Sequence, residues 1–198
     1  MRRSFLTLAL TALLASSMPI DAGAPATLKA GVFDPPRAAP ELALQSSNGG
    51  ALELAAYRGK VVVLGFGFTS CPEVCPTTLA VLAQTRQRLG AAADDVQVIY
   101  VTVDPERDDA ARMKKYLSTF DKTFVGGTAS AERLAAVRSQ YGVLAEKKYY
   151  GSSYSVAHSS STYLIDRRGT LRALMPYGRT PADYVHDLQI LLAERDGT

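Results

Sequence analysis

The two cysteines of this chain, Cys71 and Cys75, are separated by three residues and are the side chains best suited to chemistry. Two neighbouring thiols can ligate a soft metal ion, exchange electrons as a dithiol, or form a structural disulfide. A disulfide that closes so short a loop removes little entropy from the unfolded chain, so it would stabilise the fold weakly. The spacing therefore favours a reactive pair over a structural one.

Pro76 follows the second cysteine directly. Proline has no backbone N–H and fits best at the first position of a helix, which predicts a helix with Cys75 as its N-cap and Cys71 in the preceding loop. The positive end of the helix dipole would then favour thiolates and lower the thiol pKa. Thiolates serve metal binding and nucleophilic attack alike, so both chemistries remain open at this point.

Strand and helix signals alternate from residue 41 onward. Two short alternating runs flank residues 46–50 and predict an opening hairpin, and continuous apolar runs at 61–66 and 96–103 predict strands buried on both faces. Later signals comprise helices near 79–89, 108–120, 130–141 and 181–193, and hairpins over 143–156 and 161–175. Ser130 and Thr180 are the predicted N-caps of the last two helices. This order predicts an α/β, thioredoxin-like three-layer fold, with a central mixed β-sheet flanked by helices and an N-terminal β-hairpin extension.

His158 is the third candidate for the site, because it precedes the strand predicted at 161–166. In a thioredoxin-like layer the loop before that strand faces the cysteine loop. One imidazole and two thiolates suit Cu(I), and a fourth oxygen ligand would make them workable for Cu(II). Zinc usually requires four protein ligands, and the sequence offers no obvious fourth. A single histidine near a strand is more often structural or solvated, so the residues alone leave that alternative open.

Two aspartates follow the second central strand. Asp104 precedes Pro105 and is expected to form a turn, and Asp108 is expected to cap the helix predicted from residue 108. These positions lie at the carboxyl end of a central strand, which is the usual functional edge of an α/β sheet. A structural role for Asp104 is favoured over a role in the site or in docking. His186 is expected to be a surface residue of the last helix.

Residues 1–24 predict an export signal or N-terminal anchor. Arg2 and Arg3 precede an apolar run at 5–14, and residues 22–24 fit an A-x-A cleavage site, with 15–17 as a rival. The apolar run is well short of the ~20 residues that span a bilayer. The proline-containing segment 25–40 is predicted to be a flexible tether or extended lead-in, ahead of one domain over 41–198. We expect a periplasmic protein, with tethering to the inner membrane left open.

The composition excludes other classes of protein. The 198 residues include 21% charged and 47% hydrophobic side chains, which is typical of a globular domain. The net charge is +3, and no dense run of Lys and Arg with interleaved aromatics is present. Binding to nucleic acid is therefore not expected.

Three blocks of this sequence resemble the Sco/SenC family. Residues 66–76, FGFTSCPEVCP, resemble its F-G-Y-T-x-C-P-D-V-C-P signature, and residues 102–108, TVDPERD, resemble its T-V-D-P-E-R-D block. His158 with residues 163–166, YLID, is similar to the third block, H-S-x-x-x-Y-L-I-D. The blocks occur in order at family-like separations, and the resemblance covers about residues 41–192.

The resemblance implies a copper chaperone that delivers Cu(I) or Cu(II) to the copper A centre of cytochrome c oxidase. It implies Cys71, Cys75 and His158 as copper ligands, with the copper-binding subunit of the oxidase, an upstream copper donor and a thiol reductant as partners. Two positions depart from the family pattern. Glu73 stands where Asp is usual, and Ala157 replaces the acidic residue often found before the histidine. One contact around the copper site is therefore expected to be missing.

The alternative function is a periplasmic thiol–disulfide oxidoreductase that acts on the cysteines of a copper-binding partner, with Cys71 and Cys75 as its redox-active pair. Thioredoxin-type reductases use C-x-x-C and a cis-proline before the facing strand. This chain has an extra residue between its cysteines and no proline between Pro105 and Pro176. These differences favour metal delivery over a turnover enzyme. A peroxidase is not expected, because no motif pairs a peroxidatic cysteine with an activating arginine.

Overall fold

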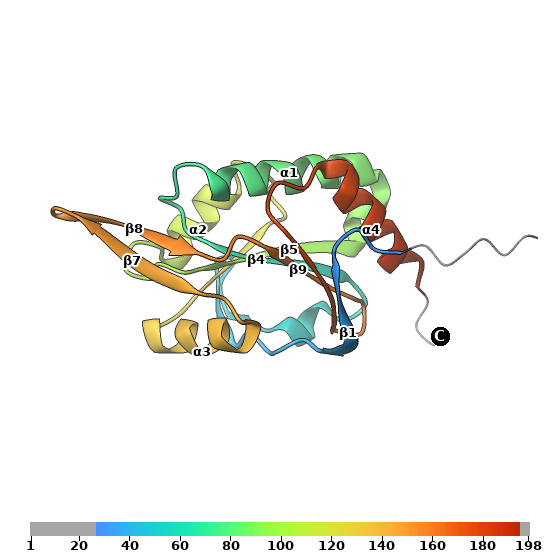
Figure 1. Cartoon of the computed structure of the whole chain (residues 1–198), viewed down its shortest axis with the longest axis horizontal. Coiled ribbons are helices and arrows are strands. Elements are labelled where there is room, and N and C mark those ends of the chain that lie inside the picture. Colours follow the sequence, from blue (N-terminus) through green and yellow to red (C-terminus); the bar gives the residue numbers. More distant parts are fainter. Residues whose placement is uncertain (1–26, 195–198) are drawn as a thin grey trace, which may run out of the picture.

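The computed structural model of this chain describes residues 27–194, so the leader expected over 1–24 lies outside the described residues. Its centre is an eight-stranded mixed sheet (Figure 1). In spatial order the strands are β1 (Gly31–Ala38), β10 (Thr170–Met175), β9 (Thr162–Ile165), β4 (Val61–Gly67), β5 (Val96–Thr102), β6 (Val125–Thr128), β2 (Leu44–Ser46) and β3 (Ala51–Leu52). Strands β4, β5 and β6 are parallel, and the other neighbours are antiparallel. The predicted mixed sheet and opening hairpin are confirmed.

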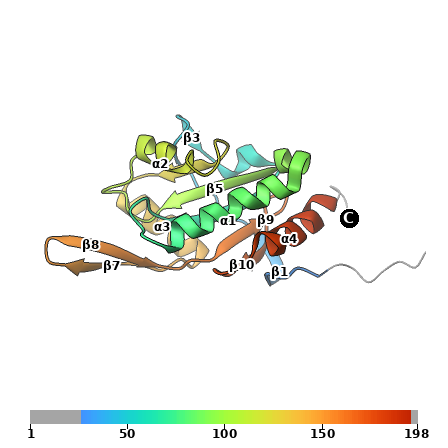
Figure 2. The same cartoon turned by 90° about the horizontal axis from the view of Figure 1, so that it is seen from above.

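Helices cover both faces of the sheet, as the predicted three-layer fold requires. Helices α1 (Val74–Leu89), α2 (Ala110–Leu117) and α4 (Pro181–Ala193) lie on one face, and α3 (Ala131–Tyr141) lies on the other (Figures 1 and 2). Strand β4 is buried at every position, because helices cover it on both sides. Within residues 27–194, no helix is both long and apolar enough to cross a bilayer.

The predicted N-caps of the last two helices are confirmed. The Ser130 side chain accepts a hydrogen bond from the Arg133 N–H at the start of α3. Thr180 and Asp183 exchange hydrogen bonds in a capping box at the start of α4. Each cap satisfies N–H groups that have no partner within the helix, so these local signals fix where both helices begin.

Of the two expectations for residues 25–40, a flexible tether or an extended lead-in, Gly31–Ala38 matches the second, because it forms β1 along the edge of β10. The pairing register shifts between Val32 and Arg37, so Pro35 and Pro36 fall in an irregular part of an edge strand, where proline is tolerated. The segment before β1 is fixed as well, because the backbone N–H groups of Lys29 and Ala30 both donate to the buried Asp187 carboxylate at 2.8 Å.

The hairpin predicted over 143–156 is confirmed, and it forms a second sheet of its own. Strands β7 (Ala145–Tyr150) and β8 (Ser153–His158) pair only with each other in the described chain. Figures 1 and 2 show this hairpin extending well beyond the main body. The last residue of β8 is His158, so the base of the hairpin places this side chain.

Candidate metal centre

The structure brings the three candidate ligands together. One ligand atom from each of Cys71, Cys75 and His158 lies within 4.8 Å of the other two. The Cys75 sulfur is 3.5 Å from Nε2 of His158, and the Cys75 backbone N–H donates to the Cys71 sulfur at 3.4 Å. Both cysteines are free thiols. Two sulfurs and one imidazole nitrogen therefore converge from segments that are 83 residues apart in the sequence.

The cysteines lie where β4 gives way to α1, as predicted, but the helix begins earlier than expected. Its N-cap is Glu73 and its first residue is Val74, so Cys75 is the second helical residue and not the cap. Pro76 is the third residue. The first N–H groups of a helix have no partner within it, so proline fits this position without losing a hydrogen bond.

Burial, and not the helix dipole, dominates the protonation of Cys75. The side chain is fully buried, and this burial raises the pKa of the Cys75 thiol to about 12, although hydrogen bonds from Tyr100 and the Phe68 backbone act in the opposite direction. The lowered pKa expected for a thiol at a helix N-terminus is therefore wrong for Cys75. At neutral pH its sulfur carries a proton, which a metal ion must displace.

His158 presents its Nε2 atom to the cysteines in the form that a metal can use. Its Nδ1 lies 2.7 Å from the Ser159 carbonyl oxygen, which can only accept, so Nδ1 carries the proton of the neutral ring. Burial lowers the pKa of His158, which keeps the ring neutral near pH 7. Phe68 packs edge-to-face against the ring, with centroids 5.8 Å apart. These contacts orient the Nε2 lone pair toward Cys75.

Tyr100 lies at this centre, although the sequence pattern indicates only that it is part of a buried strand. Its hydroxyl acts to lower the pKa of the Cys75 thiol, against the larger effect of burial, and its ring lies against Gly67, at the end of β4. Nothing in the spacing of the sequence indicates this role. Only the parallel register of β4 and β5 brings the tyrosine under the cysteine.

The sequence predicts Asp108 as the N-cap of α2, and this prediction is wrong. The N-cap is Asp109, whose side chain accepts a hydrogen bond from the Arg112 N–H. Asp108 instead turns inward and is fully buried. Its carboxylate accepts from the Thr69 backbone N–H at 2.9 Å, from the Thr69 hydroxyl at 2.5 Å and from the Thr102 hydroxyl at 2.8 Å. Asp108 thereby ties the loop before Cys71 to β5.

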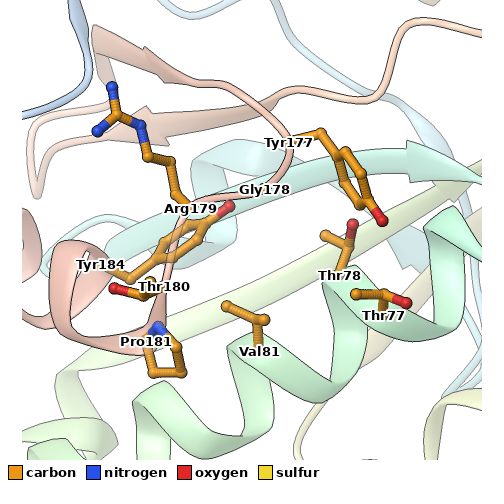
Figure 3. A pocket seen from close by; sticks show the side chains of 9 residues that line it. All are labelled: Thr77, Thr78, Val81, Tyr177, Gly178, Arg179, Thr180, Pro181 and Tyr184. Carbon is orange, nitrogen blue, oxygen red and sulfur yellow. The ribbon is translucent and has the colours of Figure 1, made fainter.

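A separate hollow of about 260 Å³ lies between α1 and the segment that joins β10 to α4 (Figure 3). Its nine lining residues include no cysteine, histidine or carboxylate: Thr77, Thr78, Val81, Tyr177, Gly178, Arg179, Thr180, Pro181 and Tyr184. The buried hydroxyls are engaged elsewhere, since Thr78 donates to the Val74 carbonyl and Tyr184 bonds to Thr162. This hollow is therefore not part of the metal centre.

The SCO1/SenC family matches residues 34–193, which include all three candidate ligands. The mouse protein "Protein SCO2 homolog, mitochondrial" is 39% identical over 130 residues, covering 64% of this chain and 50% of the mouse protein. The chain thus spans about half the length of the mouse and bovine relatives that it matches.

Solved structures show the same fold. The copper-bound structure of Bradyrhizobium japonicum ScoI is 35% identical, with a TM-score of 0.72 over 78% of this chain and 99% of the ScoI chain. The apo Sco1 protein from Thermus thermophilus is 34% identical, with a TM-score of 0.76 over 85% of this chain and 99% of that one. The thioredoxin-like fold predicted from the order of elements is confirmed.

Proposed function

This chain belongs to the SCO1/SenC family, and from that membership we propose that it is a metallochaperone that binds copper through Cys71, Cys75 and His158. The observation that carries the proposal is the convergence of their three ligand atoms within 4.8 Å. A structure of a relative that is 35% identical was solved with copper bound, which supports copper as the cargo.

The donor set matches the chemistry of copper. Thiolate sulfur is a soft ligand that favours Cu(I), and imidazole binds both oxidation states. Two sulfurs and one nitrogen fill a three-coordinate Cu(I) site, whereas Cu(II) would take an additional oxygen ligand. A structural zinc site would need a fourth protein ligand, and within residues 27–194 the ligand cluster has three members.

The two sulfurs differ in access, and this difference assigns them different parts in loading. Cys71 is partly buried, whereas Cys75 is fully buried. A hollow of about 500 Å³ lies beside His158 and is lined in part by Glu146 and Ala157. Incoming copper would meet Cys71 first and then bind Cys75 as the thiol proton leaves. Both thiols must be reduced before they bind metal.

The family resemblance supports the wider setting of the proposal. The recipient would be the copper-binding subunit of cytochrome c oxidase, with transfer to its copper A centre by ligand exchange. An upstream copper donor and a thiol reductant would load and reduce the site. The expected leader would place the protein in the periplasm, with membrane association through the N-terminus.

The test compares copper binding by the reduced protein with that of the His158→Ala variant. The chain has two histidines, so His186→Ala is a matched control: that ring lies beside Asp187, on α4. We expect wild type and the control to bind one copper per chain with the same EPR spectrum of the Cu(II) complex. His158→Ala should weaken Cu(II) binding and lose the nitrogen hyperfine coupling. An unchanged affinity and spectrum in His158→Ala would rule out the three-ligand site.

One observation favours the oxidoreductase as a second candidate: Cys71 is only partly buried and lies next to the free Cys75 thiol. Cys71 would attack first and form a mixed disulfide, and the buried, protonated Cys75 would resolve it slowly, because the thiolate is the nucleophile. We therefore expect the metal-free dithiol to reduce a protein disulfide slowly. Rapid reduction, measured by thiol release, would promote this second function.

A further inference from the structure

The hairpin that carries His158 depends on contacts outside its own sheet. An isolated two-stranded hairpin is marginally stable in water, and β7 and β8 form no ladder with the main sheet within the described residues. The position of His158 therefore requires another support. The segment between β5 and α2, which includes Asp104 and Arg107, supplies it.

Tyr154 on β8 is the centre of this support. Its hydroxyl donates to Asp104 Oδ1 at 2.8 Å and lies 3.2 Å from Glu106 Oε2. The Arg107 guanidinium stacks over the Tyr154 ring at 4.0 Å and donates to the Tyr154 carbonyl at 3.1 Å. Backbone, ring and hydroxyl of this one tyrosine are thus all held by the same segment.

Strand β7, the other strand of the hairpin, contacts the same segment. The Lys147 ammonium on β7 pairs with Glu106 at 2.5 Å and lies 4.5 Å from the centre of the Tyr154 ring. Asp104 is fully buried and forms an ion pair with Arg107, which fixes the guanidinium against the Tyr154 ring. The support is therefore charged, partly buried and continuous with the main sheet.

The same arginine connects the hairpin to the metal centre. Arg107 lies 5.6 Å from the centre of the Phe68 ring, and Phe68 packs edge-to-face on His158. We propose that Tyr154 and Arg107 form a latch that positions His158 against the cysteines. Asp104 supports the latch from below, which explains its burial at the carboxyl end of β5. This inference rests on the proposed role of His158 as a ligand.

The latch is tested with Tyr154→Phe, which removes the hydroxyl and keeps the ring. Tyr149→Phe is the matched control, because Tyr149 pairs directly with Tyr154 across the hairpin but is 70% exposed. In the metal-free protein we expect backbone amides of residues 145–158 to exchange about tenfold faster in Tyr154→Phe, as for a lost hydrogen bond to a charged group. The control should exchange at the wild-type rate. Equal exchange in Tyr154→Phe and wild type would overturn the latch without using copper at all.

A double-mutant cycle with His158→Ala then shows whether the latch acts through His158. Tyr154→Phe should weaken Cu(II) binding several-fold in the wild-type background and have no effect in the His158→Ala background. Equal weakening in both backgrounds would overturn the positioning role. If His158→Ala alone leaves copper binding unchanged, the proposed site fails, and the exchange experiment still decides whether the hairpin is latched. Arg107→Lys, which keeps the charge but loses the planar stack, should reproduce the Tyr154→Phe pattern.

Discussion

Gly67 and Tyr100 occupy adjoining space so closely that a Cβ atom on Gly67 would lie 2.1 Å from the Tyr100 hydroxyl oxygen. Position 67 therefore requires glycine because the Tyr100 side chain on the neighbouring strand leaves no room for a Cβ atom, and not because of the backbone conformation. The Tyr100 hydroxyl in turn acts to lower the pKa of the Cys75 thiol. The glycine that ends β4 thus makes room for a group beneath the metal centre.

We expect Gly67→Ala to displace the Tyr100 ring and to lower the free energy of unfolding by about 2 kcal/mol, as for overpacking in a core. The matched control is Gly31→Ala, where the nearest atom to an added Cβ is the Leu174 carbonyl oxygen at 3.7 Å. That variant should stay within about 0.5 kcal/mol of wild type. Urea denaturation measures both, and equal stability of the two variants would contradict the close contact.

Copper affinity should rise with pH. The Cys75 pKa of about 12 means that binding releases its proton throughout the neutral range, so the affinity should rise by roughly tenfold per pH unit for this one proton. Because burial lowers the pKa of His158, its ring adds no slope above neutrality. Competition titrations with a Cu(I) chelator at a series of pH values measure the slope. Cys75→Ala should lower the slope by this one-proton contribution, and an unchanged slope would refute its assignment to Cys75.

The two neighbouring aspartates should differ in their effect on stability. Asp108→Ala leaves the partly buried Thr69 donors and the buried Thr102 hydroxyl without their acceptor and should lower the free energy of unfolding by about 3 kcal/mol. Asp109→Ala removes an exposed helix cap and should cost about 1 kcal/mol. Denaturation curves give the order. The reverse order would contradict the role of Asp108 as a buried acceptor.

Removing the Asp187 carboxylate should increase hydrogen exchange at the start of the described chain. In Asp187→Ala the Lys29 and Ala30 N–H groups lose their carboxylate, so amides of β1 should exchange at least about tenfold faster. Strands β4 and β5 in the core should keep their protection. Hydrogen exchange measured by mass spectrometry separates the two regions. Uniformly faster exchange throughout would instead indicate a global loss of stability.

The parts of the fold that the sequence predicts correctly are those with local signals. The apolar runs that become β4 and β5, and the caps Ser130 and Thr180, depend on neighbours in sequence. Strand β1 escapes prediction because its partner, β10, lies at the far end of the chain and its prolines are equally typical of a linker. Asp108 and Asp109 are adjacent, so sequence alone does not decide which one caps the helix.

In the candidate site, too, the sequence predicts some residues and misses others. The sequence identifies Cys71, Cys75 and His158 because their motifs are short and ordered along the chain. The high pKa of Cys75 cannot be read from the sequence, because it depends on packing that buries the sulfur. Tyr100 and the contacts of Tyr154 escape prediction for the same reason. They depend on strand register and on a hairpin folding back over another loop.

The unequal access of the two sulfurs sets an order for the formation and breaking of bonds. For copper bound as proposed, entry that begins at the partly buried Cys71 implies departure along the same path in reverse, with the bond to Cys71 the last to break. A recipient would therefore approach from the side of Cys71 and form a shared, mixed-ligand intermediate there. The covered sulfur of Cys75 would retain the metal between encounters, and the open sulfur would pass it on.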